Sequence, residues 1–331
     1  MKVLIAYDGS ECSDAAILDL RRAGLPAVAQ VLVLSVAEMS MLVEAVPSGT
    51  LLACPGMVLP DSMESDATSG HQLQEAKAFA AQAADRLRAD FPSWNINTEA
   101  WVDAAGSAII RTAHAWNPDL IVVGSHGRSG ISRFVLGSVS QQVLHHLTCS
   151  VRISRHPLNP QERSIRLLIG VDGSDDAKAA IHSVVERNWP AGTEARAVGV
   201  LESQVPHATV AKLEGATHTA MEDESRSRIS KAVYEAALDL AKCGLHASHQ
   251  VLTGTPGEVL LAEAEQWSAD CVFVGARGLS GPERFSLGSV STAVASHAHC
   301  SVEIVGPRVE PLPTPAPGDE RSHKNYSVRN S

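Results

Sequence analysis

Short aliphatic runs alternate with longer amphipathic segments along the chain. The first run, Val3–Tyr7, ends in a polar turn, and Ser13 then precedes a helical pattern over Asp14–Ala23. In Leu73–Asp90, apolar residues recur near the spacing of an α-helix. Continuous apolar strands that alternate with helices are typical of a parallel sheet covered on both faces. The pattern therefore predicts an α/β protein.

The same pattern predicts five strands and four helices in the first part of the chain and a similar series after it. The first strands are Val3–Tyr7, Gln30–Val36, Ile96–Val102, Leu120–Val123 and Val151–Ile153, and the helices are Asp14–Ala23, Leu73–Asp90, Gly106–His114 and Val139–His146. The later strands are Leu167–Val171, Arg196–Leu201, Ala247–Leu252, Cys271–Val274 and Val302–Val305, with helices at Ser225–Cys243, Pro256–Gln266 and Ser289–Ser296.

Two stretches of the sequence occur twice. Residues 2–17 match residues 166–181 at 8 of 16 positions, and residues 117–153 match residues 268–304 at 19 of 37 positions. The matches keep the same order, so the chain consists of two homologous units joined head to tail. The offsets of 164 and 151 leave 13 extra residues in the first unit.

These repeats set the domain boundaries. We expect a first domain at 1–154, a linker at 155–164, a second domain at 165–305 and a proline-rich, disordered tail at 306–331. The extra residues fall in Met39–His71, which is rich in proline and glycine. A long loop of this kind is either a lid or partner surface, or a surface insertion with no role.

Composition excludes several classes of protein. The net charge is −10, from 27 Lys and Arg against 37 Asp and Glu, which argues against binding to nucleic acid or an anionic membrane. The six cysteines form no C-x-x-C pair, so a zinc knuckle or a thioredoxin-type site is not expected. Too few apolar residues precede Asp8 for a signal peptide, and a reducing, cytoplasmic setting is predicted.

Candidate chemistry lies at the carboxyl ends of two strands in each unit, where open α/β sheets bind ligands. Asp8, or Asp172 in the second unit, follows the first strand. The fourth strand is followed by the pattern G-x2-G-x9-G-S, which begins at Gly124 and at Gly275. Glycines let backbone N–H groups face an anion, and the last glycine opens a helix whose free N–H groups point the same way. Ser138 and Ser140 are expected to add hydroxyl donors.

The alternative is that these glycines bind no ligand and only make a sharp connection between strand and helix. The pattern occurs twice, each time with an upstream Asp, which favours phosphate binding. It is not a P-loop, because no G-x4-G-K-[ST] is present, and no G-x-G-x-x-G follows the first strand as in a dinucleotide fold.

Together, the early Asp and G-x2-G-x9-G-S resemble the universal stress protein (UspA-like) family in its tandem two-domain form, ATP-binding subgroup. The resemblance covers both units. It implies two tandem, doubly wound, five-stranded parallel-sheet sandwiches (adenine nucleotide α-hydrolase-like), arranged as a pseudo-dimer. It also implies ATP, with Mg²⁺, as the cofactor, a stress-response or regulatory role, and a protein partner that the sequence does not name.

By this resemblance, the Asp contacts the nucleotide, a valine at the end of the second strand holds adenine through its backbone, and the loop surrounds ribose and phosphates. The implied residues are Asp8, Val36, Gly124, His126, Gly127, Gly137, Ser138, Val139 and Ser140, and then Asp172, Val200, Gly275, Arg277, Gly278, Gly288, Ser289, Val290 and Ser291.

The second loop departs from the first at three positions: Arg277 replaces His126, Leu279 replaces Arg128 and Pro282 replaces Ile131. The first change is expected to add a cation near the phosphates and the second to remove one. We therefore expect the two sites to bind ATP with unequal affinity.

The family also pairs its units through the short fifth strand, here Val151–Ile153 and Val302–Ile304. These two strands are expected to pair within one chain, with Cys149 and Cys300 as buried packing residues; a redox role is the alternative. The sequence leaves open whether whole chains also associate as a homodimer.

No catalytic or metal-binding residue is predicted. Paired histidines near helix ends, such as His145 and His146, are expected on the surface, and Asp103 near the crevice has only Gly254 as its counterpart. We expect at most slow ATP hydrolysis or autophosphorylation. The alternatives are an ATP-using enzyme that acts on a small substrate, and a nucleotide-free interaction protein.

Overall fold

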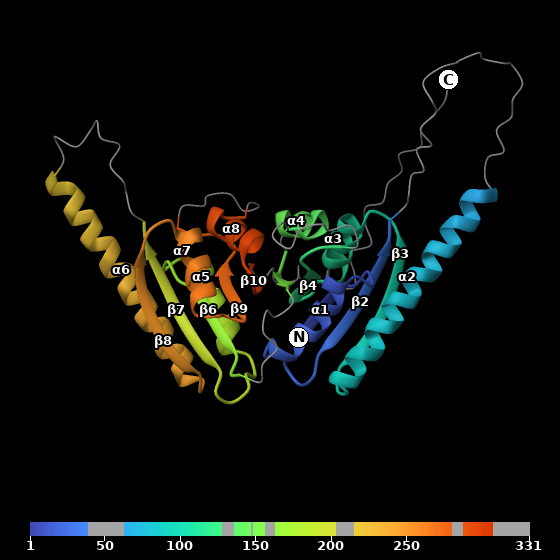
Figure 1. Ribbon diagram of the computed structural model, residues 1–331, viewed down its shortest axis with the longest axis horizontal. Helices are drawn as coiled ribbons and strands as arrows, with labels where there is room; N and C mark the ends of the chain where they lie inside the picture. The colour runs from blue at the N-terminus through green and yellow to red at the C-terminus, as the bar shows by residue number, and fades with distance from the viewer. Residues whose placement is uncertain are drawn as a thin grey trace, which may run out of the picture.

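A computed structural model describes residues 1–38, 63–127, 136–146, 148–155, 163–202, 215–279 and 287–306, with the side chains of 63–69 and 215–222 left out. Figure 1 shows two similar halves that meet in the middle of the molecule, with α2 and α6 at the outer flanks. The first half covers the described residues up to 155, and the second half those from 163 onward.

The elements of the first half are, in chain order, β1 (Lys2–Ala6), α1 (Glu11–Asp19), the 3₁₀ turn η1 (Leu20–Arg22), β2 (Gln30–Ala37), α2 (Met63–Asp90), β3 (Asn95–Val102), α3 (Ala105–Trp116), β4 (Leu120–Gly124), α4 (Ser138–His145) and β5 (Ser150–Ser154). Those of the second half are β6 (Arg166–Gly170), α5 (Asp175–Val185), β7 (Glu194–Leu201), α6 (Gly215–Lys242), β8 (His246–Thr253), α7 (Pro256–Gln266), β9 (Cys271–Gly275), α8 (Ser289–His297) and β10 (Ser301–Val305).

The ten strands of the described residues form one sheet in the order β3-β2-β1-β4-β5-β10-β9-β6-β7-β8. Pairing within each half is parallel, and the strand order reverses between β1 and β4, and again between β6 and β9. The contact between β5 and β10 is antiparallel, with Val302 opposite Ile153 and Ile304 opposite Val151. We call this contact the seam. The α/β fold with tandem, pseudo-dimeric halves that the sequence predicts is confirmed.

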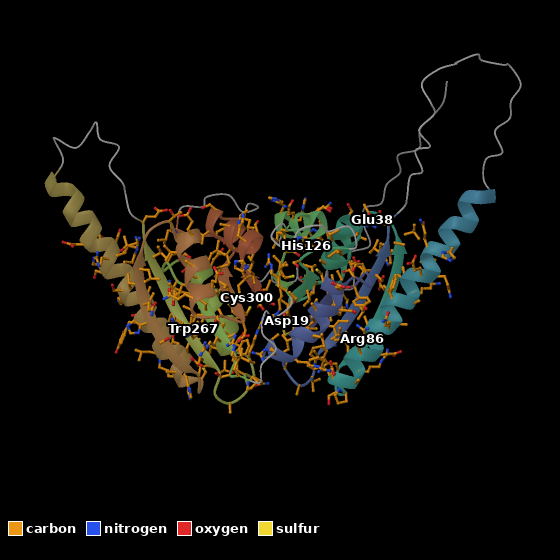
Figure 2. The ribbon with its side chains drawn as sticks, in the orientation of Figure 1. Asp19, Glu38, Arg86, His126, Trp267 and Cys300 are labelled. Carbon is orange, nitrogen blue, oxygen red and sulfur yellow. The ribbon has the colours of Figure 1, made fainter. Side chains whose placement is uncertain are left out.

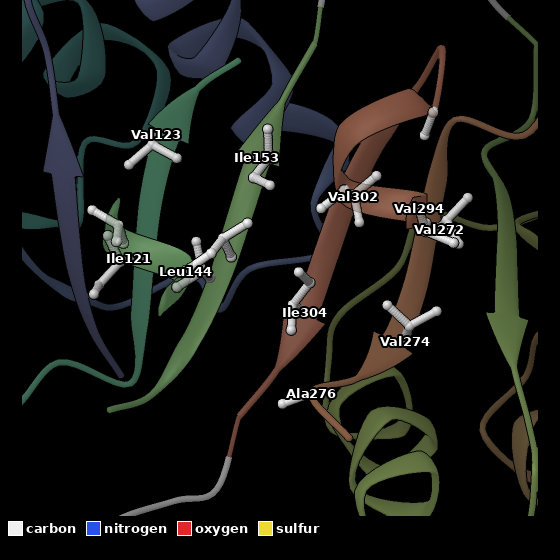
Figure 3. Close-up of a cluster of buried hydrophobic side chains, with 14 of the residues drawn as sticks. Ile121, Val123, Leu144, Ile153, Val272, Val274, Ala276, Val294, Val302 and Ile304 are labelled. Carbon is white, nitrogen blue, oxygen red and sulfur yellow. The ribbon is translucent and has the colours of Figure 1, made fainter. Parts of the chain in front are cut away.

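Alternation along each strand divides the core between the two faces of the sheet. Leu4 of β1 joins a cluster that also contains residues of both halves, whereas Val3 and Ile5 point into a separate cluster of the first half. The shared cluster crosses the seam through Ile153, Val302 and their neighbours, as Figure 3 shows. On the opposite face, under α1 and α2 or α5 and α6, each half keeps its own core.

Several predicted boundaries were wrong. Helix α1 begins at Glu11, not Asp14, because Ser10 is its N-cap and accepts a bond from the Ser13 backbone N–H at 3.2 Å. Residues 63–71 belong to α2, so the predicted loop is shorter than Met39–His71, and its remainder lies outside the described residues. Helix α5 was not predicted, although its cap, Ser174, repeats Ser10.

The structure does not test two further predicted segments, the linker and the tail. Most of the predicted linker (156–162) and nearly all of the predicted tail (307–331) lie outside the described residues. Within the described part of the chain, no helix has both the length and the apolar character needed to cross a membrane.

Candidate functional site: a glycine-lined cavity at the switch point

A cavity of about 450 Å³ opens in the first half where the strand order reverses, beyond the carboxyl ends of β1 and β4. This volume lies within the range of about 300–1,000 Å³ that is usual for small-molecule sites. The cavity is lined by every residue that the sequence assigned to the first site: Asp8, Val36, Gly124, His126, Gly127, Gly137, Ser138, Val139 and Ser140. In Figure 2, His126 and Glu38 lie toward this end of the first half, and Arg86 lies toward the other end.

One wall is the turn between β1 and α1. The Asp8 carboxylate accepts a hydrogen bond from the Ser10 backbone N–H at 3.0 Å, which fixes the carboxylate at the end of the strand. Between them, Gly9 has φ +76°, and a Cβ there would lie 2.5 Å from the Phe79 ring. Only glycine fits this turn, because both the backbone conformation and the space exclude a side chain.

The opposite wall is the glycine loop. The Gly137 N–H donates to the Ser125 carbonyl at 2.8 Å and so ties the start of α4 to the end of β4. A Cβ on Gly127 would lie 3.2 Å from the Asp8 carboxylate, and a Cβ on Gly137 would lie 3.2 Å from the backbone of His126. The missing side chains let the loop lie close against the carboxylate, and both groups line the cavity. The first N–H groups of α4, which Gly137 cannot cap with a side chain, open toward the same space.

Ser140 has a different role from the expected one. It is buried, and its hydroxyl donates to the Gly124 carbonyl at 2.7 Å, so its proton is used inside the protein. Ser291 of the second half does the same with Gly275 at 2.6 Å. In this structure the Ser140 proton is therefore used within the protein, and both serines hold the helix against the strand. Ser138 is exposed at the first helical position.

His126 is a neutral group at this site. Burial, and in second place the charge of Arg155, lowers the pKa of His126 below its usual range. Its Nδ1 lies 3.1 Å from the Ser125 hydroxyl, and its Nε2 is buried with no hydrogen-bond partner among the described residues. His126 therefore adds no positive charge near neutral pH, and backbone N–H groups remain to hold an anion.

Several lining residues were missed by the sequence reading. They are mostly apolar and come from elements distant in the chain: Tyr7, Leu34, Phe79 and Ile109, with Glu38 and Glu75 as charged members. Tyr7 and Glu38 could have been found from the sequence, because each directly follows a strand, β1 or β2. No sequence signal pointed to Phe79, because α2 reaches the cavity only through the tertiary fold. Among the described lining residues the charged groups are acidic, and none is Lys or Arg.

The second half repeats the same framework. Asp172 follows β6 and accepts the Ser174 N–H at 2.8 Å, Val200 lies in β7, and Gly288 caps α8, where Ser289, Val290 and Ser291 begin the helix. A Cβ on Gly278 would lie 2.8 Å from the Asp172 carboxylate. That carboxylate also accepts the Leu279 N–H at 3.2 Å, so it joins the turn after β6 to the glycine loop.

Arg277 does not supply the free cation that was expected. Its Nε lies 3.0 Å from the Asp176 carboxylate, which also accepts the Arg277 backbone N–H at 3.0 Å. Asp176 aligns with Cys12 of the first half, just as Arg277 aligns with His126. The two substitutions go together, and the carboxylate neutralises the guanidinium that the second loop gained.

Other residues singled out in the sequence lie outside the cavity. Asp103 pairs with Arg111, and His146 and His297 bond to backbone carbonyls of their own helices at 3.0 Å. Across the described ranges, no group of three or more His, Cys, Asp and Glu side chains is arranged to hold a metal ion. Burial raises the pKa of both the Cys149 and the Cys300 thiols to about 12, so each is protonated near neutral pH.

Comparison with known proteins agrees with the architecture. The model of the universal stress protein family matches residues 51–155 and again residues 165–306, which together make up well over half of the chain. The chain therefore belongs to the universal stress protein family and carries two of its domains in tandem.

Individual relatives point the same way. A universal stress protein of Mycolicibacterium smegmatis is 25 % identical over 310 residues, which cover 92 % of this chain and 97 % of that protein. A universal stress protein of Mycobacterium tuberculosis is 27 % identical over 186 residues, and the match spans 60 % of its length and 56 % of this chain. Among solved structures, a universal stress protein from Archaeoglobus fulgidus has a TM-score of 0.59 at 21 % identity, covering 92 % of this chain and 98 % of that one.

Proposed function

We propose that this universal stress protein binds ATP in the first half and acts as a nucleotide-dependent stress-response or regulatory module. One observation carries the proposal. Residues chosen from sequence for their fit to a nucleotide line a single cavity, with a carboxylate on one side and a glycine loop and helix N-terminus on the other. The cytoplasm is the proposed location.

The cavity suggests how each part of ATP is held. The backbone near Val36 takes adenine, the Asp8 carboxylate accepts a ribose hydroxyl, and the N–H groups at Gly127 and the start of α4 receive the phosphates. Since the described lining has acidic residues and no Lys or Arg, the phosphate charge must be balanced from elsewhere. Mg²⁺ carried by the phosphates would supply that balance, with Asp8 close enough to assist through water.

The same lining argues for slow chemistry at most. A P-loop enzyme draws charge off the transferred phosphate with a lysine, and no such cation lines the described part of this cavity. We therefore propose that nucleotide occupancy, rather than turnover, is the useful output, read by a protein partner yet to be identified.

In the second half, we propose weaker ATP binding. Where the first loop has His126 beside Cys12, the second has Arg277 paired with Asp176. A nucleotide would have to displace or share these bonds. The sequence predicted unequal affinities because Arg277 would add a cation near the phosphates. We keep the prediction for a different reason, since Arg277 is paired and does not offer a free charge.

The test begins with the protein as purified. Its ligand is released by heat and identified by mass spectrometry, and Mg·ATP binding is then measured by calorimetry. Gly127→Val fills the gap beside Asp8, whereas the control Gly70→Val lies on an exposed stretch of α2 with nothing within 4 Å of its Cβ.

We expect an adenine nucleotide in the released fraction, intact binding in Gly70→Val and loss of the stronger site in Gly127→Val. Turnover below about 1 s⁻¹, unlike that of an ordinary enzyme, supports the module. Absence of binding at millimolar ATP would favour a nucleotide-free interaction protein. Turnover well above that rate, lost in Asp8→Ala, would favour an ATP-using enzyme.

A further inference from the structure

Two opposite charges face each other across the seam, on the side of the sheet that α1 and α5 cover. Arg152 of β5 lies directly opposite Glu303 of β10 in the strand register. The guanidinium Nη1 is 3.2 Å from the carboxylate Oε2, and the two side chains are 1 % and 0 % exposed. A charged pair this deeply buried needs further partners, because water cannot reach it.

Each member of the pair has a second partner from its own half. Arg152 donates from Nε to Asp19 at 2.7 Å and from Nη2 to the same carboxylate at 3.1 Å. Glu303 accepts from Arg187, whose Nη1 lies 2.9 Å from Oε2 and whose Nη2 bonds to Oε1. The result is a row of alternating charges, Asp19, Arg152, Glu303 and Arg187, which we call the charge row. Figure 2 shows Asp19 near the middle of the molecule, where the halves meet.

The repeat makes this row informative. Arg152 and Glu303 occupy the same position in the two aligned units, and so do Asp19 and Ser183, and Ala23 and Arg187. Each half therefore carries one pair of opposite charges. In the first half the strand carries the cation, Arg152, whereas in the second half the strand carries the anion, Glu303. Two first halves that met through β5 would bring Arg152 against Arg152. Two second halves would bring Glu303 against Glu303.

The other side of the seam does not distinguish the halves. Val151 and Ile153 of β5 and Val302 and Ile304 of β10 are all fully buried in the shared apolar cluster. Branched aliphatic residues occupy both edges, so this side would accept either edge in either position. On the two facing strands themselves, the residues that differ in charge are Arg152 and Glu303 of the charge row.

We infer that the charge row makes the seam selective: the β5 edge fits the β10 edge and rejects a second copy of itself. Like charges buried face to face without water are strongly unfavourable, and such repulsion is an effective way to exclude a wrong partner. Buried ion pairs add little stability over well-packed apolar residues, so selectivity is their better-supported role here. The consequence is that chains do not join through two β5 edges or two β10 edges.

The direct test removes the charges and keeps the packing. A four-site variant, Asp19→Leu, Arg152→Met, Arg187→Met and Glu303→Leu, is unfolded and refolded at high concentration beside the wild-type chain, and masses are measured by light scattering after size exclusion. Wild-type dimers give the baseline for exchange of halves between chains. We expect a larger dimer fraction in the variant, because its edges no longer discriminate. An equal dimer fraction in the two proteins would overturn the inference.

A second test covers the case in which the four-site variant does not fold. Glu303→Arg places Arg opposite Arg152 and so imitates the rejected contact within one chain, whereas Glu303→Gln removes the carboxylate and adds no third cation. We expect the Tm of Glu303→Arg to lie at least about 5 °C below that of Glu303→Gln.

Arg22→Glu serves as the control, because Arg22 also bridges the halves, to Asp270 at 3.1 Å, but its side chain is 30 % exposed. We expect only a small shift in its Tm. Equal Tm values for Glu303→Arg and Glu303→Gln would show that the row has no selective role.

Discussion

The two halves share a framework, but they carry different side chains beside the glycine loop. In both, a Ser hydroxyl holds the glycine loop to the fourth strand, through Ser140 at 2.7 Å and Ser291 at 2.6 Å. Beside that loop, the first half has a neutral His126 and Cys12, whereas the second has the ion pair Arg277 and Asp176. Backbone contacts that shape the loop were kept through duplication, while side chains next to it changed in pairs.

The halves differ more in how the two helices on one face of the sheet, α1 and α2 or α5 and α6, contact each other. In the first half, the Tyr7 hydroxyl lies 2.5 Å from Asp14, which also pairs with Arg86 of α2. In the second half, Val171 and Lys178 occupy the positions of Tyr7 and Asp14, and a hollow of about 650 Å³ lies between α5 and α6. Because Val171 has no hydroxyl and Lys178 has no carboxylate, the bridge from Tyr7 through Asp14 is not repeated at these positions. Its described lining includes Gly173 but none of Gly275, Gly278 and Gly288 of the second glycine loop.

The largest expected effect is on packing between the first helix and the fourth strand of each half. A Cβ on Gly275 would lie 2.6 Å from the Asp176 backbone, and one on Gly124 would lie 2.9 Å from the Cys12 backbone. We expect Gly275→Ala to cost about 3 kcal/mol and Gly124→Ala about 2 kcal/mol, because backbone on both sides must move.

Thermal unfolding checks the order of these two variants. Gly70→Ala, which meets nothing within 4 Å in a helix, should be neutral or stabilising and serves as the control. If Gly275→Ala unfolds at the same temperature as that control, the close approach of α5 to β9 is not rigid.

Nucleotide affinity separates the halves next. Gly127→Val leaves only the second site, and Gly278→Val leaves only the first. We expect a loss of about 100-fold, near 2.7 kcal/mol, at whichever site is filled by the new side chain. Calorimetry with Mg·ATP should then give a tighter dissociation constant for Gly278→Val than for Gly127→Val. Equal constants would contradict unequal sites.

The pH dependence of stability should reveal the bridge from Tyr7 through Asp14 in the first half. Burial first, and then the hydrogen bond to Asp14, raises the pKa of Tyr7 from 10.0 to about 12. Because the folded pKa is the higher one, this contribution to stability is complete below about pH 10 and is lost as the pH rises toward 12.

Tyr7→Phe gives the comparison. We expect it to melt below the wild type at pH 8 and the difference to shrink between pH 10 and 12, since buried thiols titrate equally in both proteins. Absorbance of the phenolate should show a late-titrating group missing from the variant. A difference in Tm that stays constant over that range would contradict the assignment.

The smallest expected effect concerns the ion pair beside the glycine loop of the second half. Arg277 and Asp176 are 23 % and 20 % exposed, so a double-mutant cycle with Ala at each should give a coupling of about 1 kcal/mol. The Lys178 and Asp175 pair, at 68 % and 95 % exposure, should give almost none. If Arg277→Ala is as harmful without Asp176 as with it, the two substitutions are not paired in the way we infer.

The sequence determined most of the architecture. Aliphatic runs and amphipathic segments identified the strands and most helices, because burial on both faces of a sheet leaves a strong pattern. The repeat established the two halves and the likeness of their loops. Asp8 and the glycines of the loop followed from the rule that strand carboxyl ends meet at the switch point, and they line one cavity.

Only the tertiary structure decided how side chains are used. Ser140 carries a hydroxyl that the sequence offers to a ligand, but the fold brings Gly124 within reach and takes the proton. Arg277 reads as an added cation until Asp176 lies beside it, and only the register of the seam places Arg152 opposite Glu303. Periodicity reports which positions are buried, since burial follows from local geometry. It does not report which distant charges meet there, because that depends on how the two halves pair.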